Sequence, residues 1–318
     1  MRKKKRPFGQ LALIGLPVLA IGGGLWYFLS QKPAPAPVAP TPVVVTPPPA
    51  KPIVKAVPVA AKPAAPVNTS SLPLRYQGKT FKGATEVFTQ KVVALTFDDG
   101  PWPVSTLAIL DILQKENIKA TFFCLGRSIH NHPELLLSVA QAGHVLGNHS
   151  WNHPYARMSP KVAQAEIDNT TNLMIQTVGV KPELFRPPGG KLSNGLAAYA
   201  ASRKYSIVLW NDVSGDDQRK TTPEMEVKNV LTHVRPGAVV LMHDGGGKHP
   251  TVQALPKIIA GLKQQGYSFV TVPELLQMED EQLTKAAIPR SPSKVYTNQL
   301  PTATPAPTPA PAVSTPSP

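Results

Sequence analysis

Two adjacent acids, Asp98 and Asp99, are the residues of this sequence best suited to chemistry. They close the apolar run Val92-Val93-Ala94-Leu95, and Gly100-Pro101 follows at once. The run is typical of a buried strand, and the Gly-Pro pair of the loop after it. Neighbouring buried carboxylates are costly unless a cation neutralises them. A metal ion would do this and leave one carboxylate free as a base; the alternative is an ordinary turn with two solvated acids.

Two histidines, His149 and His153, lie four residues apart. One helical turn would bring both imidazoles to the same face, within reach of a single ion. Two histidines and one carboxylate leave a position for water, as in a catalytic rather than a structural zinc site. Taken alone, the pair is read more simply as two turn histidines. Together with Asp98 and Asp99, it favours a metal.

Two further residues could assist such a centre. His243 ends the apolar run Leu241-Met242, where it could donate a proton, or it could be a loop histidine without a role. Arg186 precedes Pro187-Pro188-Gly189-Gly190. An arginine can orient a carboxylate through a bidentate contact, and a glycine N–H allows a substrate to approach closely. The alternative for this segment is a plain loop.

The elements that would position these residues alternate along the chain. Strand-like runs occupy residues 92–96, 120–125, 144–146, 206–210, 238–242 and 268–272. Helical spacing of apolar residues occurs at residues 104–116, 133–142, 160–178, 223–234 and 251–264. This alternation predicts a parallel sheet with crossover helices, and six or seven units suit a closed or nearly closed barrel. The polar motifs follow the strands, where barrels of parallel strands carry their chemistry.

The ends of the chain have a different composition. A basic segment, residues 1–7, precedes an apolar run at residues 8–30, which is long enough for a bilayer core of roughly 20 residues. We expect an uncleaved membrane anchor with the N-terminus in the cytoplasm and the rest of the chain outside it. A cleaved secretory signal, and so a secreted protein, is the alternative. Residues 31–74 predict a Pro/Ala-rich linker, residues 75–280 the folded domain, and residues 281–318 a disordered Pro/Thr-rich tail.

The net charge and the single cysteine bear on binding partners and on disulfide bonding. The net charge of +14 comes without a nucleic-acid-binding motif, so we expect no nucleic-acid partner. We also expect a monomer. The positive charge suits an anionic cell envelope, or it only keeps the linker soluble. The single cysteine, Cys124, lies in an apolar strand pattern, which predicts a buried thiol and no disulfide framework.

In order along the chain, these motifs resemble those of the polysaccharide deacetylases, the NodB-homology enzymes of carbohydrate esterase family 4. The resemblance covers about residues 91–276, and its specificity lies in the ordered set of Asp98-Asp99, His149 with His153, Arg186-Pro187-Pro188, Asp216 and Leu241-Met242-His243. It implies a distorted (β/α) barrel of about seven parallel strands.

The resemblance also implies a role for each matching residue. Asp98 matches the general base, and His243 the general acid. Asp99, His149 and His153 match the metal ligands, with zinc preferred. Further roles are implied for Arg186 in holding the base, for Leu241 in walling the acetyl pocket, and for Asp216 beside the acid.

Two motifs depart from the family pattern. Gly189 stands where the family usually has a tyrosine whose backbone N–H helps to hold the oxyanion; that backbone donor survives the change, but the loop is looser. The fourth motif, usually Asp-x-x-Asp-Trp, keeps only its second acid if Asp216 is the match; Asp212 or Asp217 could be the match instead. Its tryptophan is missing. Trp210 could replace it as a sugar-stacking wall, although core packing is the simpler role.

The resemblance implies hydrolysis of N-acetyl groups from N-acetylglucosamine units of an envelope polysaccharide, with peptidoglycan favoured and chitin oligomers next. One alternative keeps the site and changes the bond, as in an O-acetyl esterase acting on xylan or another glycan. A second alternative is a catalytically inactive glycan-binding wall module, to which the two altered motifs would point.

Overall fold

A parallel sheet organises the folded part of the chain. The computed structural model describes residues 72–246 and 250–287. The sheet order is β1-β6-β5-β4-β3-β2-β8-β7, with β9 pairing beside part of β2, and every pairing is parallel. The strands are β1 (Thr80–Phe81), β2 (Val92–Asp98), β3 (Thr121–Cys124), β4 (Val145–Asn148), β5 (Leu184–Phe185), β6 (Ser206–Val208), β7 (Asp212–Val213), β8 (Ala238–His243) and β9 (Ser268–Phe269).

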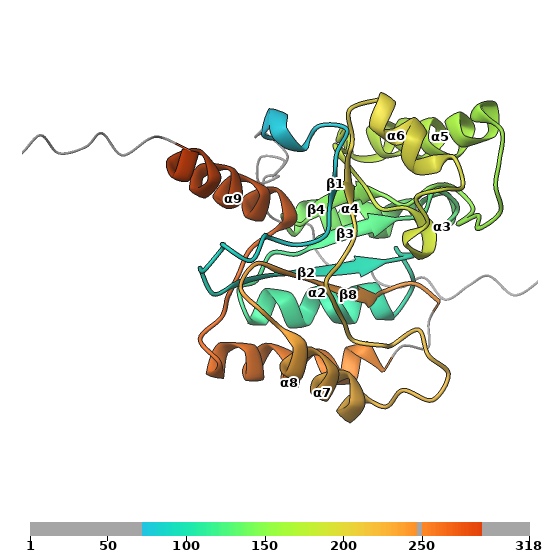
Figure 1. The fold of residues 1–318 in the computed structure, drawn as a ribbon. Helices are drawn as coiled ribbons and strands as arrows, with labels where there is room; N and C mark the ends of the chain where they lie inside the picture. The colour runs from blue at the N-terminus through green and yellow to red at the C-terminus, as the bar shows by residue number, and fades with distance from the viewer. Residues whose placement is uncertain (1–71, 247–249, 288–318) are drawn as a thin grey trace, which may run out of the picture. The chain divides into compact units, whose positions relative to one another are not determined.

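Helices connect and cover these strands, as Figure 1 shows for α2, α7 and α8, which lie together on one side of β2 and β8. The helices are η1 (Leu74–Tyr76), α2 (Ser105–Lys115), α3 (Gly126–Asn131), α4 (Pro133–Gln141), α5 (Pro160–Val178), η2 (Pro188–Gly190), α6 (Leu196–Ser202), α7 (Pro223–His233), α8 (Thr251–Gln264) and α9 (Val272–Ala287).

The expected parallel α/β architecture is confirmed, but the strand count and the closure differ from the expectation. The sheet has nine strands within the described residues, and its end strands, β1 and β7, do not pair with each other. It is therefore an open, curled half-barrel rather than a closed barrel of about seven strands. The sequence missed β1, β5 and β7 because each has only two residues, too few for an apolar pattern.

The central strand, β2, is apolar because both of its faces are buried, as is usual in parallel sheets. Val93, Leu95 and Phe97 pack with residues of α2 and α8 in one hydrophobic cluster. The opposite face begins with Val92 and Ala94, which belong to a second cluster. On that same face, Thr96 and Asp98 come next and are both buried. On this face of β2, the buried polar residues therefore follow the apolar ones toward the C-terminal end of the strand.

The longest helix, α5, is delimited by its capping residues. Ser159 precedes it in an extended conformation, and its hydroxyl accepts a hydrogen bond from the Val162 N–H. Pro160 stands at the first helical position, where a missing N–H costs nothing. Gly179 ends the helix with a φ of 71°, a left-handed conformation that glycine adopts without strain. Through Glu166, α5 also holds the loop that follows β4.

The C-terminal helix, α9, packs on the second cluster through Val272, Leu275 and Leu276. It runs to Ala287, past the domain boundary placed at residue 280. Cys124 is buried and free, as the sequence indicated. Within residues 72–246 and 250–287, none of the helices combines the length and apolarity needed to cross a bilayer. The anchor expected at residues 8–30 lies outside the described residues.

Candidate metal centre and catalytic site

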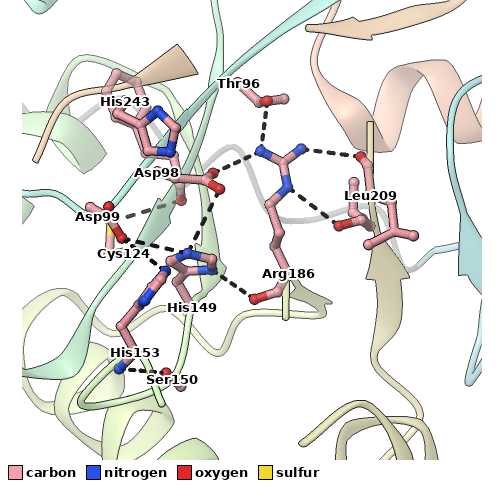
Figure 2. A network of polar contacts seen from close by, with 12 residues as sticks. Thr96, Asp98, Asp99, Cys124, His149, Ser150, His153, Arg186, Leu209 and His243 are labelled. Atoms are coloured by element: carbon pink, nitrogen blue, oxygen red, sulfur yellow. Dashed lines mark hydrogen bonds and ion pairs between the residues drawn. The ribbon is translucent and has the colours of Figure 1, made fainter. Parts of the chain in front are cut away.

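The motif residues meet at the C-terminal ends of four strands. Asp98 is the last residue of β2 and His243 the last of β8, and these two residues are register partners on adjacent strands. His149 follows β4 directly, and Arg186 follows β5. Figure 2 shows their side chains converging, with Arg186 on one side of Asp98 and His149 with His153 on the other. Parallel strands bring distant segments together because all of their C-terminal ends lie at one edge.

Asp99, His149 and His153 form a group whose ligand atoms all lie within 4.8 Å of one another. Oδ1 of Asp99 is 3.5 Å from Nε2 of His149 and 3.6 Å from Nε2 of His153. Two ligand atoms that are each about 2.1 Å from a tetrahedral ion stand about 3.4 Å apart. The buried Oδ1 of Asp99 has no hydrogen-bond partner among the described residues. The three side chains therefore fit a divalent cation such as zinc.

The ring of His149 is oriented by a backbone contact. Its Nδ1 lies 2.7 Å from the carbonyl oxygen of Arg186. A carbonyl can only accept, so Nδ1 carries the proton and Nε2 presents a lone pair toward Asp99. Burial lowers the pKa of His149 to about 3, despite the opposing charge of Asp99. This histidine is therefore neutral at physiological pH, as a metal ligand must be.

The two histidines do not share a helical turn, so that expectation is wrong. Residues 149–153 form an irregular loop in which Ser150 and His153 have φ angles of 70° and 60°. These left-handed residues turn the chain back within a short distance, and the His153 N–H donates to the Ser150 hydroxyl at 3.1 Å. Loop geometry, not helical periodicity, brings the imidazole ring centroids to 5.0 Å from each other.

Glu166 of α5 fastens this loop, and sequence reasoning missed it. Its Oε2 accepts the N–H groups of Trp151 and Asn152 at 2.9 and 2.8 Å. Its Oε1 accepts from the Asn152 side-chain amide at 2.8 Å. Glu166 is buried, so these three bonds satisfy a carboxylate that would otherwise be costly. A glutamate in the middle of a helix carries no sequence signal of this role.

Arg186 is fully buried, and each of its three side-chain nitrogens donates at least one hydrogen bond. Its Nη1 donates to Oδ1 of Asp98 at 2.7 Å and to the Thr96 hydroxyl at 2.8 Å. Its Nε and Nη2 donate to the carbonyl oxygens of Val208 and Leu209, each at 3.3 Å. The contact with Asp98 uses one nitrogen and one oxygen, so the bidentate contact expected from sequence is wrong.

This single contact leaves the second oxygen of Asp98 facing the histidines, with Oδ2 3.7 Å from Nε2 of His149. Burial raises the pKa of the Asp98 carboxyl, and the Arg186 guanidinium opposes that rise. Phe123 covers the guanidinium, with the ring centroid 4.1 Å from its central carbon. Arg186 therefore fixes the orientation of the buried Asp98 carboxylate.

His243 is bound to Asp216 at two points. Its backbone N–H donates to Oδ2 of Asp216, and Nδ1 lies 2.7 Å from Oδ1. The Thr251 hydroxyl donates to Oδ2 of the same carboxylate at 2.6 Å. Burial lowers the pKa of His243, but the hydrogen bond and charge of Asp216 outweigh it and raise this pKa to about 9. The imidazole is therefore protonated at neutral pH.

Among the three acids considered for the fourth motif, the structure brings Asp216 to His243. Asp217 is exposed. Asp212 belongs to β7, where Oδ1 accepts the Val213 N–H and Oδ2 has no partner among the described residues. Burial raises the pKa of Asp212 to about 7.

Three further residues lie around this centre. Leu241 is nearly buried on β8, two residues before His243 and therefore on the same face of the strand. Gly189 is exposed in η2 with a φ of 57°. Trp210 is half-buried against the second cluster, and its ring centroid lies 5.6 Å from the Arg186 guanidinium. Trp210 thus has the core contacts that its sequence position suggested.

Comparisons with known proteins find related sequences and solved structures. The family profile described as "Polysaccharide deacetylase" matches residues 85–208. A peptidoglycan-N-acetylglucosamine deacetylase from Bacillus cereus is 41% identical over 192 residues, covering 59% of this chain and 89% of that protein. A solved peptidoglycan N-acetylglucosamine deacetylase matches with a TM-score of 0.60 and 33% identity, over 64% of this chain and 95% of the other.

A second solved structure differs in its named substrate. It is a family 4 acetyl xylan esterase from Clostridium thermocellum, in complex with a cobalt ion. It matches with a TM-score of 0.54 and 36% identity, over 59% of this chain and 91% of the other.

Proposed function

Because this chain belongs to the polysaccharide deacetylase family, we propose that it removes N-acetyl groups from N-acetylglucosamine units of peptidoglycan at a divalent metal. The observation that carries the proposal is the convergence of Asp99, His149 and His153 beside Asp98 and His243. The choice of peptidoglycan is supported by the named activity of the Bacillus cereus relative. Chitin-type oligomers are the next candidate, because they carry the same N-acetyl group.

We infer that zinc is the resident ion, held by Asp99, His149 and His153. Two imidazoles and one carboxylate are the donor set of many catalytic zinc sites. A divalent cation held there would supply Lewis acidity to the acetamide carbonyl and would make a nearby water more acidic.

Asp98 acts as the general base and takes the proton of the attacking water. Its Oδ1 is engaged by Arg186, so Oδ2 receives the proton. The role of Arg186 is to keep the carboxylate in one orientation, because a base must lie within hydrogen-bond reach of the proton it removes. As negative charge develops on the carbonyl oxygen, the exposed N–H of Gly189 donates a hydrogen bond to it.

His243 acts as the general acid and gives its proton to the departing nitrogen. An amine leaves poorly until it is protonated, so this step completes cleavage of the C–N bond. Asp216 keeps the imidazolium charged and oriented. Leu241 forms one wall of the pocket for the acetyl methyl group. The products are acetate and a free amino sugar, which gives the glycan one positive charge for each site.

A second candidate is hydrolysis of O-acetyl esters on xylan or another glycan. The likeness to the acetyl xylan esterase favours it. An alkoxide leaves more readily than an amine, so an esterase depends less on its general acid. Replacement of His243 by alanine would therefore be tolerated in an esterase and would abolish turnover in an N-deacetylase.

The location of the protein belongs to this proposal too. We propose that residues 8–30 anchor the chain and that the domain acts outside the cytoplasmic membrane, where peptidoglycan lies. The apolar length of this run and the basic residues before it support the anchor.

Acetate release from peptidoglycan and from chitin oligomers tests the proposed function directly. We expect release from peptidoglycan, loss of release after a chelator, and recovery on addition of zinc. Release that is unaffected by chelator would contradict the metal. Release from acetylated xylan alone would establish the esterase instead, and no release from any substrate would indicate an inactive glycan-binding module.

A further inference from the structure

Tyr155 lies beside the candidate metal centre without belonging to it. Its ring packs edge-on against that of His153, with centroids 4.8 Å apart and planes at 78°. Despite this contact, 54% of its surface is exposed. An exposed large aromatic next to a catalytic centre leaves apolar area available for another molecule.

The ring of Tyr155, in the loop after β4, also lies against Gly189 in the loop after β5. A Cβ built on Gly189 would lie 2.8 Å from Cε1 of Tyr155, so the ring occupies the space that a side chain at residue 189 would need. Gly189 adopts a left-handed φ of 57°, which suits glycine as well. The loop after β4 therefore supplies an aromatic ring at a place where the loop after β5 has no side chain.

Lys191 adds a positive charge to this ring. Its Nζ lies 5.4 Å from the ring centroid of Tyr155, within cation–π range. Lys191 is exposed, and it forms no ion pair with a carboxylate in residues 72–246 or 250–287. An exposed ammonium held over an aromatic ring is available to a carboxylate on a bound molecule.

We propose that Tyr155 and Lys191 form a binding subsite for a pyranose unit that carries a carboxylate. The ring of Tyr155 packs against the apolar C–H face of the sugar, and the ammonium of Lys191 pairs with the carboxylate. The inference rests on the proposed function, because it places an acidic sugar next to the unit that is deacetylated. The subsite thus favours glycan strands with free carboxylates, such as strands freed of peptides, over neutral chitin.

Equilibrium binding to the Asp98→Asn protein tests the subsite without turnover. The probes are peptidoglycan glycan strands freed of peptides, the same strands with their carboxylates converted to amides, and a neutral chitin oligomer. In this background, Lys191→Gln should weaken binding of the acidic strands by about three- to ten-fold and leave the amidated strands unchanged. Tyr155→Ala should weaken all three probes by about ten-fold, whereas Tyr155→Phe should retain binding.

A matched control is Lys181→Gln, which removes one positive charge from an exposed residue before β5, at the opposite end of that strand from Gly189. It should bind every probe as the parent does.

Equal losses in Lys191→Gln and Lys181→Gln, or no loss in Lys191→Gln, would overturn the subsite. A Tyr155→Ala protein that binds glycan normally but loses zinc affinity would overturn it too, and would assign Tyr155 to the metal centre. Absence of acetate release by the native protein would count against the proposed function alone, because these affinities do not depend on turnover.

Discussion

The neighbouring carboxylates of Asp98 and Asp99 lie in different environments because the two residues have different backbone conformations. Asp98 is the last residue of β2 and points to Arg186, whereas Asp99 has a φ of 73° and points to the histidines. Aspartate tolerates this left-handed conformation better than most residues. The change from strand to left-handed turn, between one residue and the next, separates a candidate base from a candidate metal ligand.

Replacing Asp98 by asparagine should abolish deacetylation and leave metal binding intact. The amide keeps the shape and can still accept from Arg186, but it cannot take a proton from water. We expect a loss of kcat/KM of at least about a hundred-fold. Acetate release and metal content measured on the same preparation check this. The exposed Asp217→Asn protein serves as control, and a variant at Asp98 that retained activity would remove this residue as the base.

The raised pKa of His243 predicts how activity depends on pH. Asp216 holds this pKa at about 9, above its ordinary value of 6.5, so the protonated acid persists to about pH 9. In an Asp216→Asn protein the pKa of His243 should fall, and activity should be lost on the alkaline side about one to two pH units earlier. The pH dependence of kcat/KM measures this shift. An alkaline limit at the same pH in both proteins would show that His243 does not act as the acid.

At the scale of elements, the loop of residues 149–153, which carries both histidines, depends on helix α5 for its position. Glu166 accepts three hydrogen bonds from Trp151 and Asn152. Asn148 reinforces the attachment: its side chain donates to the Ile167 carbonyl of α5 and accepts the Ser150 N–H. The spacing of the metal ligands is thus set by the packing of α5 on the end of β4.

Replacing Glu166 by glutamine should loosen this loop. Glutamine keeps one acceptor oxygen but turns an N–H₂ group toward backbone donors, which leaves buried donors unsatisfied. We expect a loss of about 1–3 kcal/mol in the free energy of unfolding, together with weaker zinc binding. Denaturant unfolding and zinc titration measure the two effects. The exposed Glu134→Gln on α4 should change neither quantity, and unaltered zinc affinity in Glu166→Gln would separate the loop from the metal.

At the scale of the whole folded domain, the first and last described elements stabilise the same side of the sheet. The hydroxyl of Tyr76 in η1 donates to Glu279 of α9 at 2.7 Å, and the other oxygen of Glu279 accepts the Thr85 N–H. Leu275 of α9 is fully buried in the second cluster. Although α9 lies far from the site residues in sequence, it covers the N-terminal part of the strand that carries Asp98.

Replacing Leu275 by alanine should destabilise the domain without changing the site itself. Loss of a fully buried leucine costs about 2–5 kcal/mol in the free energy of unfolding. Denaturant unfolding measures this loss, and kcat/KM at low temperature should stay close to that of the native protein. Leu137→Ala is the matched control because 41% of Leu137 is exposed on α4. Equal stability of the two variants would show that α9 is not part of the core.

The sequence alone determined the alternation of strands and helices, because hydrophobic periodicity is a local property. It therefore predicted the parallel sheet, and the apolar run before Asp98 indicated β2 within two residues of its end. It also predicted that Asp98-Asp99, His149 and His243 lie at or directly after the ends of strands, where the structure has them. It expected the same of Arg186, although the two-residue strand before it, β5, gave no recognisable pattern. These positions could be predicted because carboxylate, imidazole and guanidinium groups are typical of catalytic and metal sites, and because they stand next to apolar runs.

Tertiary structure alone decided the features that depend on contacts between distant segments. The open edge of the sheet rests on two-residue strands that hydrogen bonding creates and no local pattern reveals. The choice of Asp216 over Asp212 and Asp217 depended on which carboxylate reaches His243. Glu166 and Tyr155 acquire their positions through the packing of loops against residues far along the chain. Local sequence specifies an element and its neighbours in the chain, whereas a contact between segments exists only once the chain has folded.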